Sequence, residues 1–337
     1  MAWYNTTGHE QDVIVSSRIR LARNITNYPF EPRLGASEAK DIIESVKSSL
    51  GDKYKCTDFM EITPTEAQAY AERNIISPEF ASKKTPRALF EDDQNQVDIM
   101  VCEEDHIRIQ CIMSGLSLDE AFIRACACDD VLDSNLDYAY GEELGYLTHC
   151  PTNLGTGMRA SVMMFLPALT ANRIIPALRT QLSKIGITIR GRFGEGSDTD
   201  GSLYQISNQI TLGVSEDETI KKLTGVVAQI TNQERAVRKK MYDQHPEKLC
   251  DKIRRSYGTM LYATLISSEE FIKLYSDVRL GIALGIITTP NLDYPKIDTL
   301  LVNELPANLT LNSETDISTN QIQRDKSRAA MVRNEMG

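Results

Sequence analysis

Cys150-Pro151-Thr152-Asn153-Leu154-Gly155-Thr156-Gly157-Met158-Arg159 is the stretch around which this 337-residue chain is organised. It joins a thiol, turn-forming residues, two glycines and a cation in one short loop, and the apolar residues 160–166 follow it. We expect these apolar residues to form a helix. The N–H groups at its start, with Arg159 beside them, would favour phosphate. Such a positive neighbourhood also lowers the pKa of a thiol such as Cys150. A plain turn with a structural cysteine suits the same residues, and both interpretations stay open at this point.

The composition is that of an ordinary globular protein. The chain is 41% hydrophobic and 25% charged, which is enough for one large domain and a smaller one. Its net charge of −10 argues against general binding to nucleic acid or to an anionic membrane. The seven cysteines form no paired CxxC framework, and the four histidines lack metal-ligand spacing, so we expect free thiols and no metal site built by the protein. Residues 1–12 lack a signal-peptide core and no apolar run could span a membrane, which predicts a cytoplasmic protein.

Segments with period-two alternation lie on both sides of the central stretch and predict strands whose polar faces carry cations. In the first segment Arg18 and Arg20 share one face. Three consecutive acids, residues 103–105, would form a solvated turn on their own, but the strand after them presents Arg108. The predicted strands cover residues 13–24, 97–101, 106–110, 187–193 and 204–212.

Apolar residues at helical spacing predict helices between and after these strands. Capping boxes begin at Thr63, Ser117, Ser215 and Ser267. From about His245 the pattern is helical except for a short predicted strand at residues 309–311, so we place a domain boundary near residue 244. The predicted helices cover residues 37–50, 64–74, 118–132, 171–185, 216–237, 246–262, 267–284, 293–305 and 320–333.

Several arginines on separate segments of this acidic chain predict a phosphate clamp, since planar guanidinium groups bind phosphate oxygens bidentately. Any one of these arginines could simply pair with an acid on the surface. That interpretation is weaker for the whole set, because several converging arginines lack an acid for each. The clamp consists of Arg18, Arg20, Arg108, Arg159 and Arg190.

Four motifs in this order resemble those of the guanidino kinases, which include the creatine and arginine phosphagen kinases. The match extends over residues 13–240 and also takes in residues 205–209. The motifs are Ser-Ser-Arg-Ile-Arg at 16–20, Glu-Glu-Asp-His-Ile-Arg at 103–108, the central stretch at 150–159, and Arg-Gly-Arg-Phe-Gly-Glu at 190–195.

Within that group the chain is most similar to the bacterial protein arginine kinases. Residues 144–148, 159–163 and 276–281 carry this likeness. Arg324-Asp325-Lys326-Ser327-Arg328-Ala329 resembles the RDxxRA phosphoarginine-binding motif of that branch. Without the resemblance, this segment would be a charged helix with Arg324 and Arg328 one turn apart.

The resemblance implies an α+β fold of the phosphagen-kinase-like, or glutamine-synthetase-like, type. An antiparallel β-sheet flanked by helices would form a catalytic domain over residues 1–244. An all-α C-terminal domain, residues 245–337, would serve dimerisation and bind phosphoarginine as an allosteric site through Arg324, Asp325 and Arg328. Only fifteen residues precede Ser16, so we expect an uncovered site that suits an arginine presented on a protein.

The resemblance also implies roles for named residues. Glu104 and Glu195 would hold two guanidinium nitrogens of the substrate and take a proton, while Cys150 would orient the same group. Mg²⁺ would bridge the phosphates of ATP without a protein ligand. Two residues depart from the family pattern, namely Cys102 in place of Asn and Asn74 in place of a histidine near adenine. The implied ATP-binding residues are Ser16, Ser17, Arg18, Ile19, Arg20, Arg108, Arg159, Ala160, Ser161, Val162, Met163, Arg190, Gly191, Arg192, Phe193, Gly194 and Glu195.

The function implied is an ATP-dependent kinase of protein arginine side chains, which marks proteins for degradation by a Clp-type system and relieves heat-shock repression. Its expected partners are proteins with exposed arginines, a heat-shock repressor, a Clp-type unfoldase and an activator protein, in a homodimer or larger oligomer. Two alternatives stay open: a kinase of a free guanidino compound, and a phosphoarginine-binding adaptor with weak kinase activity. The retained Glu104, Glu195 and Cys150 argue against the adaptor.

Overall fold

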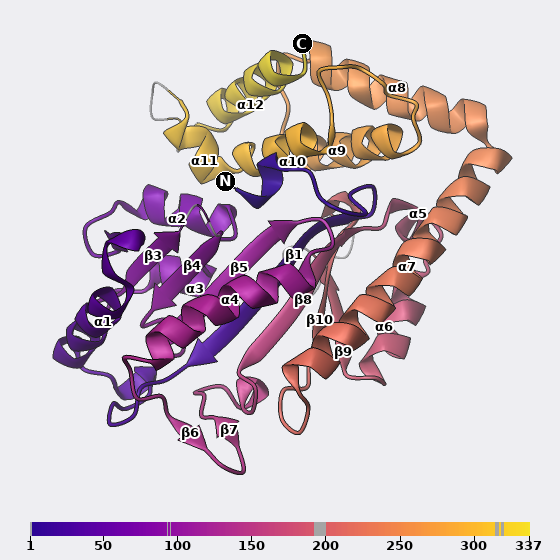
Figure 1. Ribbon diagram of the computed structural model, residues 1–337. Coiled ribbons are helices and arrows are strands. Elements are labelled where there is room, and N and C mark those ends of the chain that lie inside the picture. Colours follow the sequence, from indigo (N-terminus) through magenta and orange to yellow (C-terminus); the bar gives the residue numbers. More distant parts are fainter. Residues whose placement is uncertain (1, 93, 95, 192–199, 314–316, 318–319) are drawn as a thin grey trace.

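An eight-stranded antiparallel sheet forms the centre of the computed structural model, which describes residues 2–337 except 93, 95, 192–199, 314–316 and 318–319 (Figure 1). The strand order is β2-β3-β4-β5-β1-β8-β10-β9, so the first strand pairs with two strands that come much later in the chain. The strands are β1 Ile14–Arg23, β2 Lys55–Asp58, β3 Ala88–Asp92, β4 Val97–Val101, β5 Ile107–Ser114, β8 Met158–Phe165, β9 Ile187–Gly191 and β10 Leu203–Asn208.

Side chains that point to opposite sides alternate along these strands, so the sheet has two different faces. Helices pack on one face, which we call the covered face, and cavities lie over the other, the hollowed face. On β1, Ile19 and Leu21 join the main core, which also contains buried residues of five helices. Arg18 and Arg20 alternate with them and so lie on the opposite face. Figure 1 shows two of these helices, α4 and α7, lying across the covered face. The five helices are α1 Ala36–Leu50, α4 Leu118–Asp133, α5 Pro167–Ala171, α6 Ile175–Ser183 and α7 Glu216–Gln244.

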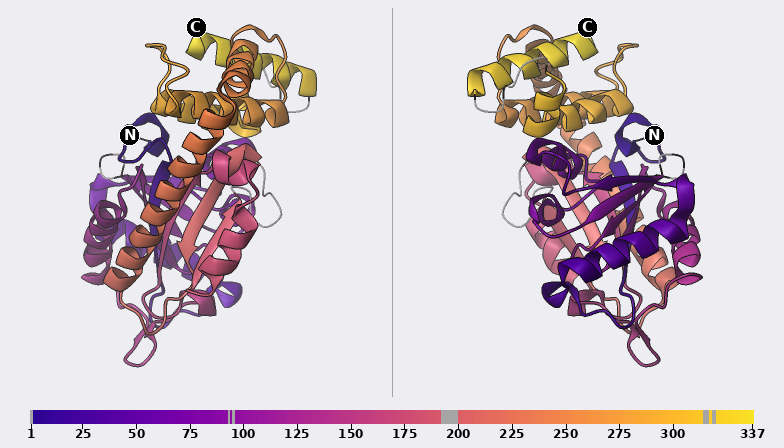
Figure 2. Two further views of the ribbon diagram at one scale, coloured as in Figure 1. Left: turned by 90° about the vertical axis from the view of Figure 1, so that its right-hand side faces the viewer. Right: turned by 90° about the vertical axis from the view of Figure 1, so that its left-hand side faces the viewer.

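Smaller elements and the C-terminal helices complete the walls of the hollowed face. The helices α2 Pro64–Glu72 and α3 Pro78–Ser82 pack on β3 and β4 through a separate apolar cluster around Phe80. The remaining helices gather beyond one end of the sheet, and the hairpin of β6 Tyr140–Gly141 and β7 Gly145–Tyr146 projects from the other end (Figures 1 and 2). These helices are α8 Pro246–Tyr262, α9 Ser268–Ala283, α10 Tyr294–Asn303, α11 Pro306–Leu311 and α12 Gln321–Met336.

The predicted α+β class with an antiparallel sheet and a helical C-terminal region is confirmed, but several local predictions are wrong. Residues 160–166 lie mostly in β8, because this short apolar run pairs with β1 and β10 in the middle of the sheet. Residues 309–311 belong to α11, which begins at Pro306. The helix predicted over 171–185 begins later, at Ile175 of α6, because Ala171 ends the short helix α5 and residues 172–174 lie between the two. Ser117 makes no capping hydrogen bond, whereas Thr63, Ser215 and Ser267 do.

The division at residue 244 stays a prediction. A turn at His245 separates α7 from α8. However, the core of the C-terminal helices also includes Trp3 from the start of the chain and Phe165 and Leu203 from the sheet. The helical region is therefore packed directly onto the part of the chain that carries the sheet. No helix of the described residues is apolar and long enough to cross a membrane.

Candidate active site

A cavity of about 800 Å³ over the hollowed face brings together most of the residues predicted to act. A neighbouring cavity of about 600 Å³ shares Arg20, Glu79 and Arg108 with it and extends to Arg18 and Asn74. A small third cavity also contains Arg18, together with Ser16, Ser161 and Met163. The three cavities thus form a row along the sheet. Of the predicted residues, the cavity of about 800 Å³ is lined by Arg20, Glu104, Arg108, Cys150, Arg159 and Arg190.

Strand register places the cations of this row directly beside one another. Arg20 on β1 is the cross-strand partner of Arg159 on β8, and Arg18 is the partner of Ser161. Like charges directly opposite each other destabilise a sheet. Burial and the neighbouring charges of Arg159 and Arg108 lower the pKa of Arg18 to about 10. The sheet therefore concentrates positive charge on this face, at an unfavourable electrostatic energy.

Two of these guanidinium groups have a buried N–H donor without an acceptor among the described residues. The pKa of Arg20 is lowered well below its usual value by burial and then by the charge of Arg18. Burial and the charge of Arg190 likewise lower the pKa of Arg159. The buried Nε atoms of Arg20 and Arg159 donate to no acceptor among the described residues. An anion with several oxygens, such as a polyphosphate, would satisfy both the charge and these donors.

The predicted catalytic carboxylate Glu104 lies at the edge of the same cavity. Arg108 bridges two neighbouring acids, with Nη2 at 2.9 Å from Glu104 and Nη1 at 2.9 Å from Glu103. The two acids differ in access, since the side chain of Glu104 is 37% exposed and that of Glu103 only 6%. Glu104 is therefore the carboxylate of this pair that can reach a ligand.

Cys150 lies beside these groups on the loop that opens the central stretch. It is half-buried, and its Sγ lies 3.0 Å from Oγ1 of Thr152. The loop is anchored by Thr211, whose hydroxyl donates to the carbonyl oxygens of Thr152 and Leu154. Gly155 has a φ of +107°, and a Cβ there would lie 2.3 Å from the Thr211 oxygen, so only glycine fits. The expected helix start is wrong, since a strand follows, but the thiol does line the cavity.

The remaining predicted nucleotide-binding residues lie in three kinds of place. The side chains of Ser17, Ile19, Ala160 and Val162 are buried on the covered side, where the Ser17 hydroxyl donates to the carbonyl oxygen of Gly115. Only their backbones could contribute to the hollowed face. Gly191 ends β9. The predicted Arg192, Phe193, Gly194 and Glu195 lie outside the described residues.

Sequence reasoning missed several residues that line the main cavity. They come from α3 and the residue after it, from the residues before α1 and from the position before Cys150, and only tertiary packing brings them together. Lys83 is the clearest case, because it contacts the hairpin that carries Glu104. The missed lining residues include Glu31, Glu79, Ser82, Lys83 and His149.

The predicted phosphoarginine site is folded into the helical region. Arg328 is 2% exposed, and its guanidinium donates to Glu304, Asp325 and the carbonyl oxygen of Ile266. In this conformation Arg328 holds α12 against its neighbours. Its role in binding phosphoarginine stays a prediction.

We predict that alkylation distinguishes the cysteines. With iodoacetamide at pH 8, the half-buried Cys150 should react, and a nucleotide with an arginine-containing peptide should slow that reaction. Burial raises the pKa of Cys102, Cys111 and Cys128 to about 12, so these thiols should stay unlabelled in the folded protein. Peptide mass spectrometry measures the labelling. Equal labelling of Cys102 and Cys150 would contradict the geometry described.

Comparison with known proteins identifies the family of this chain. A family model described as the C-terminal catalytic domain of ATP:guanido phosphotransferase matches residues 36–237. A model of the protein-arginine kinase McsB C-terminal domain matches residues 246–337. The protein-arginine kinase of Desulforamulus reducens is 42% identical, over 99% of this chain and 95% of its own length. That of Caldanaerobacter subterraneus subsp. tengcongensis is 43% identical, over 97% and 98%.

Solved structures show the same fold at lower identity. Lombricine kinase is 24% identical, with a TM-score of 0.57 over 70% of this chain and 69% of its own. The duplicated taurocyamine kinase of Schistosoma mansoni is also 24% identical, with a TM-score of 0.60 over 69% of this chain and 34% of its own. The resemblance predicted from the four motifs is therefore confirmed, and the chain belongs to the protein-arginine kinases of the ATP:guanido phosphotransferase family.

Proposed function

We propose that this protein transfers the γ-phosphoryl group of ATP to arginine side chains of proteins. One observation carries the proposal: adjacent guanidinium groups, two of which have a buried Nε without an acceptor among the described residues, line the same cavity as an accessible carboxylate. The cluster suits a polyphosphate, and the carboxylate suits a cationic acceptor. A 37% exposed Glu104 can also be reached by a side chain that is still attached to a protein.

The chemical difficulty lies in the acceptor, because the guanidinium pKa above about 12 leaves arginine protonated and a poor nucleophile. Glu104, with Glu195 from the segment outside the described residues, would accept hydrogen bonds from two guanidinium nitrogens and take a proton as attack proceeds. The Cys150 thiol lies where it could contact the same guanidinium. The protein thereby orients the acceptor nitrogen and accepts its proton.

The cations would hold the nucleotide along the row of cavities. Arg20, Arg108, Arg159 and Arg190 line the large cavity and would bind phosphate oxygens. Arg18 and Asn74 extend the row towards the C-terminal helices, where the nucleoside would lie. Mg²⁺ bound to the phosphates would neutralise charge during transfer. Fixed cations around the transferring group stabilise the charge of the transition state.

The finer biological assignments form part of this proposal. We expect the phosphorylated proteins to include a heat-shock repressor, the phosphoarginine to be recognised by a Clp-type unfoldase, and an activator protein to regulate the kinase in a cytoplasmic homodimer or larger oligomer. Arg324, Asp325 and Arg328 would bind phosphoarginine as an allosteric site. Because Arg328 contacts Glu304 and Asp325, ligand binding there would have to exchange these contacts.

The test is intact-protein mass spectrometry after incubation with MgATP and casein, followed by mapping of acid-labile phosphate to arginine. We expect phosphate on protein arginine and little on free arginine, because the accessible carboxylate can receive a side chain attached to a protein. Exclusive phosphorylation of free arginine would instead support the free guanidino kinase. If neither product formed, even with an activator protein present, the kinase proposal would be wrong.

A further inference from the structure

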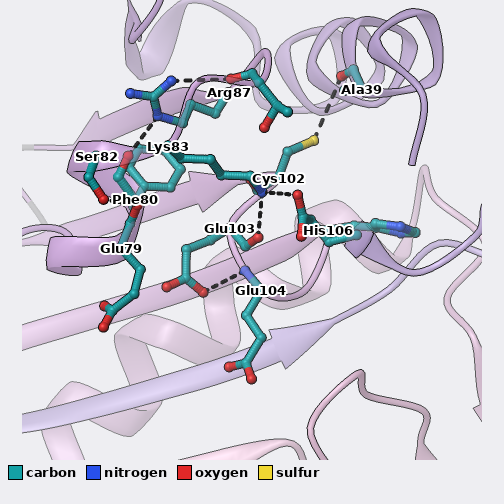
Figure 3. A network of polar contacts seen from close by, with 12 residues as sticks. Ala39, Glu79, Phe80, Ser82, Lys83, Arg87, Cys102, Glu103, Glu104 and His106 are labelled. Carbon is teal, nitrogen blue, oxygen red and sulfur yellow. Dashed lines mark hydrogen bonds and ion pairs between the residues drawn. The ribbon is translucent and has the colours of Figure 1, made fainter. Parts of the chain in front are cut away.

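Lys83 contacts the hairpin that presents Glu104, although it lies far from that hairpin in the sequence. The residue follows α3, and Figure 3 shows its amine directed at the backbone of Cys102 and Glu103. Its Nζ donates to the carbonyl oxygen of Cys102 at 2.7 Å and to that of Glu103 at 2.8 Å. It also forms an ion pair with Glu31.

These contacts use the full capacity of the amine. A lysine ammonium group has three donor hydrogens and no acceptor. The two carbonyl oxygens and the Glu31 carboxylate supply three acceptors. Although Lys83 lines the main cavity, its amine has no donor left for a phosphate or a substrate.

The backbone that Lys83 contacts needs such support. Cys102 has a φ of +62°, in the left-handed region where a residue other than Gly or Asn is strained. Strained backbone of this kind costs about 1–3 kcal/mol and persists only where surrounding contacts hold it. The Cys102 N–H donates to the His106 carbonyl oxygen at 2.8 Å, which closes the hairpin. The amine of Lys83 then holds the carbonyl end of the same residue.

The peptide unit between Glu103 and Glu104 is fixed at both ends. Lys83 binds its carbonyl oxygen, and its N–H, which belongs to Glu104, donates to the Glu103 carboxylate at 2.7 Å (Figure 3). That carboxylate is held in turn by Ser77 at 2.6 Å and by Arg108 at 2.9 Å. The direction in which the side chain of Glu104 points therefore depends on Lys83.

We propose that Lys83 is a positioning residue for the phosphoryl transfer: it holds the 102–106 hairpin so that the carboxylate of Glu104 meets the acceptor guanidinium. This inference rests on the proposed function of Glu104. A catalytic group displaced by about 1 Å can lose about 10²-fold in rate. Because Lys83 does not contact the nucleotide in this arrangement, its loss should change kcat and leave the KM for ATP nearly constant.

The test compares Lys83→Met with Lys84→Met, since Lys84 is the exposed neighbouring lysine. We expect kcat of Lys83→Met to fall by about 10- to 100-fold, in keeping with a displaced catalytic group. Its KM for ATP should stay within about threefold, and amide exchange of the peptide 101–107 should speed up by about tenfold. Lys84→Met should match the wild type in all three measurements.

A wild-type kcat or a wild-type exchange rate in Lys83→Met would overturn the proposal, and so would a change in the KM for ATP alone. If that variant does not fold, Lys83→Gln is measured in the same way, and wild-type values in it have the same meaning. The exchange measurement needs no kinase activity. It therefore separates a failure of this inference from a failure of the proposed function, which the wild-type protein alone decides.

Discussion

Replacing Glu104 with Gln will lower kcat for protein phosphorylation by about 10²- to 10⁴-fold, the range that a positioned general base contributes. Glutamine keeps the shape of the side chain, but it cannot take a proton from the acceptor guanidinium. Arg108 keeps its second partner, Glu103, so the hairpin should remain in place. The initial rate of acid-labile phosphate formation on casein measures the effect.

The control for this variant is Glu44→Gln, which makes the same chemical change at an exposed position on α1. It should keep wild-type activity. The thermal midpoint of Glu104→Gln should lie within about 2 °C of the wild type, because partly exposed ion pairs contribute at most about 1 kcal/mol. If Glu104→Gln keeps more than a third of the wild-type rate, Glu104 is not the base.

The face on which the cations lie could be predicted from sequence, because a strand alternates with a fixed period of two. This period placed Arg18 and Arg20 together and away from the core, and the structure confirms that side. The register between strands could not be predicted in the same way. That Arg20 lies opposite Arg159 depends on how β1 pairs with β8, which lies far away in the chain.

Other parts of the site depend on contacts that leave little trace in a local pattern. Residues 160–166 are apolar in a run too short to distinguish a strand from a helix, and their central place in the sheet decides the outcome. Lys83 lies in a charged segment that resembles a surface loop. Its importance appears only when the strands β4 and β5 bring the hairpin to it. The motif that contains Arg328 predicts a ligand site, but no local pattern predicts that Arg328 also contacts Glu304 in the folded chain.

Replacing Arg20 with Met will weaken ATP binding and at the same time stabilise the ligand-free protein. In the folded state Arg20 is half-buried next to Arg18, Arg108 and Arg159, and burial, followed by these like charges, lowers its pKa. A pKa lowered on folding means that the charged form is less favourable in the folded chain than in the unfolded chain. At neutral pH this penalty is fully present, and it disappears only as pH rises through the pKa of Arg20 in the folded protein towards that in the unfolded chain.

Methionine keeps much of the apolar stem of Arg20 and removes the charge. Relief of the cross-strand repulsion with Arg159 should raise stability by about 0.2–1 kcal/mol, and the thermal midpoint should rise by about 1–3 °C. Loss of a charge-assisted bond to phosphate, worth about 1.5–3 kcal/mol, should weaken the Kd for MgATP by about 10- to 150-fold. Calorimetric titration and thermal unfolding measure the two effects on the same sample.

The opposite signs of these two effects make the prediction specific. Arg254→Met, at an exposed position on α8, should change neither value. A purely structural arginine would lose stability on replacement and leave ATP binding intact, as a partner in an internal ion pair does. If Arg20→Met lowers the thermal midpoint and keeps the wild-type Kd, Arg20 belongs to the scaffold rather than to a phosphate clamp. If the midpoint rises while the Kd weakens, the sheet holds the adjacent charges of Arg20 and Arg159 for the nucleotide, and function is obtained at the expense of stability.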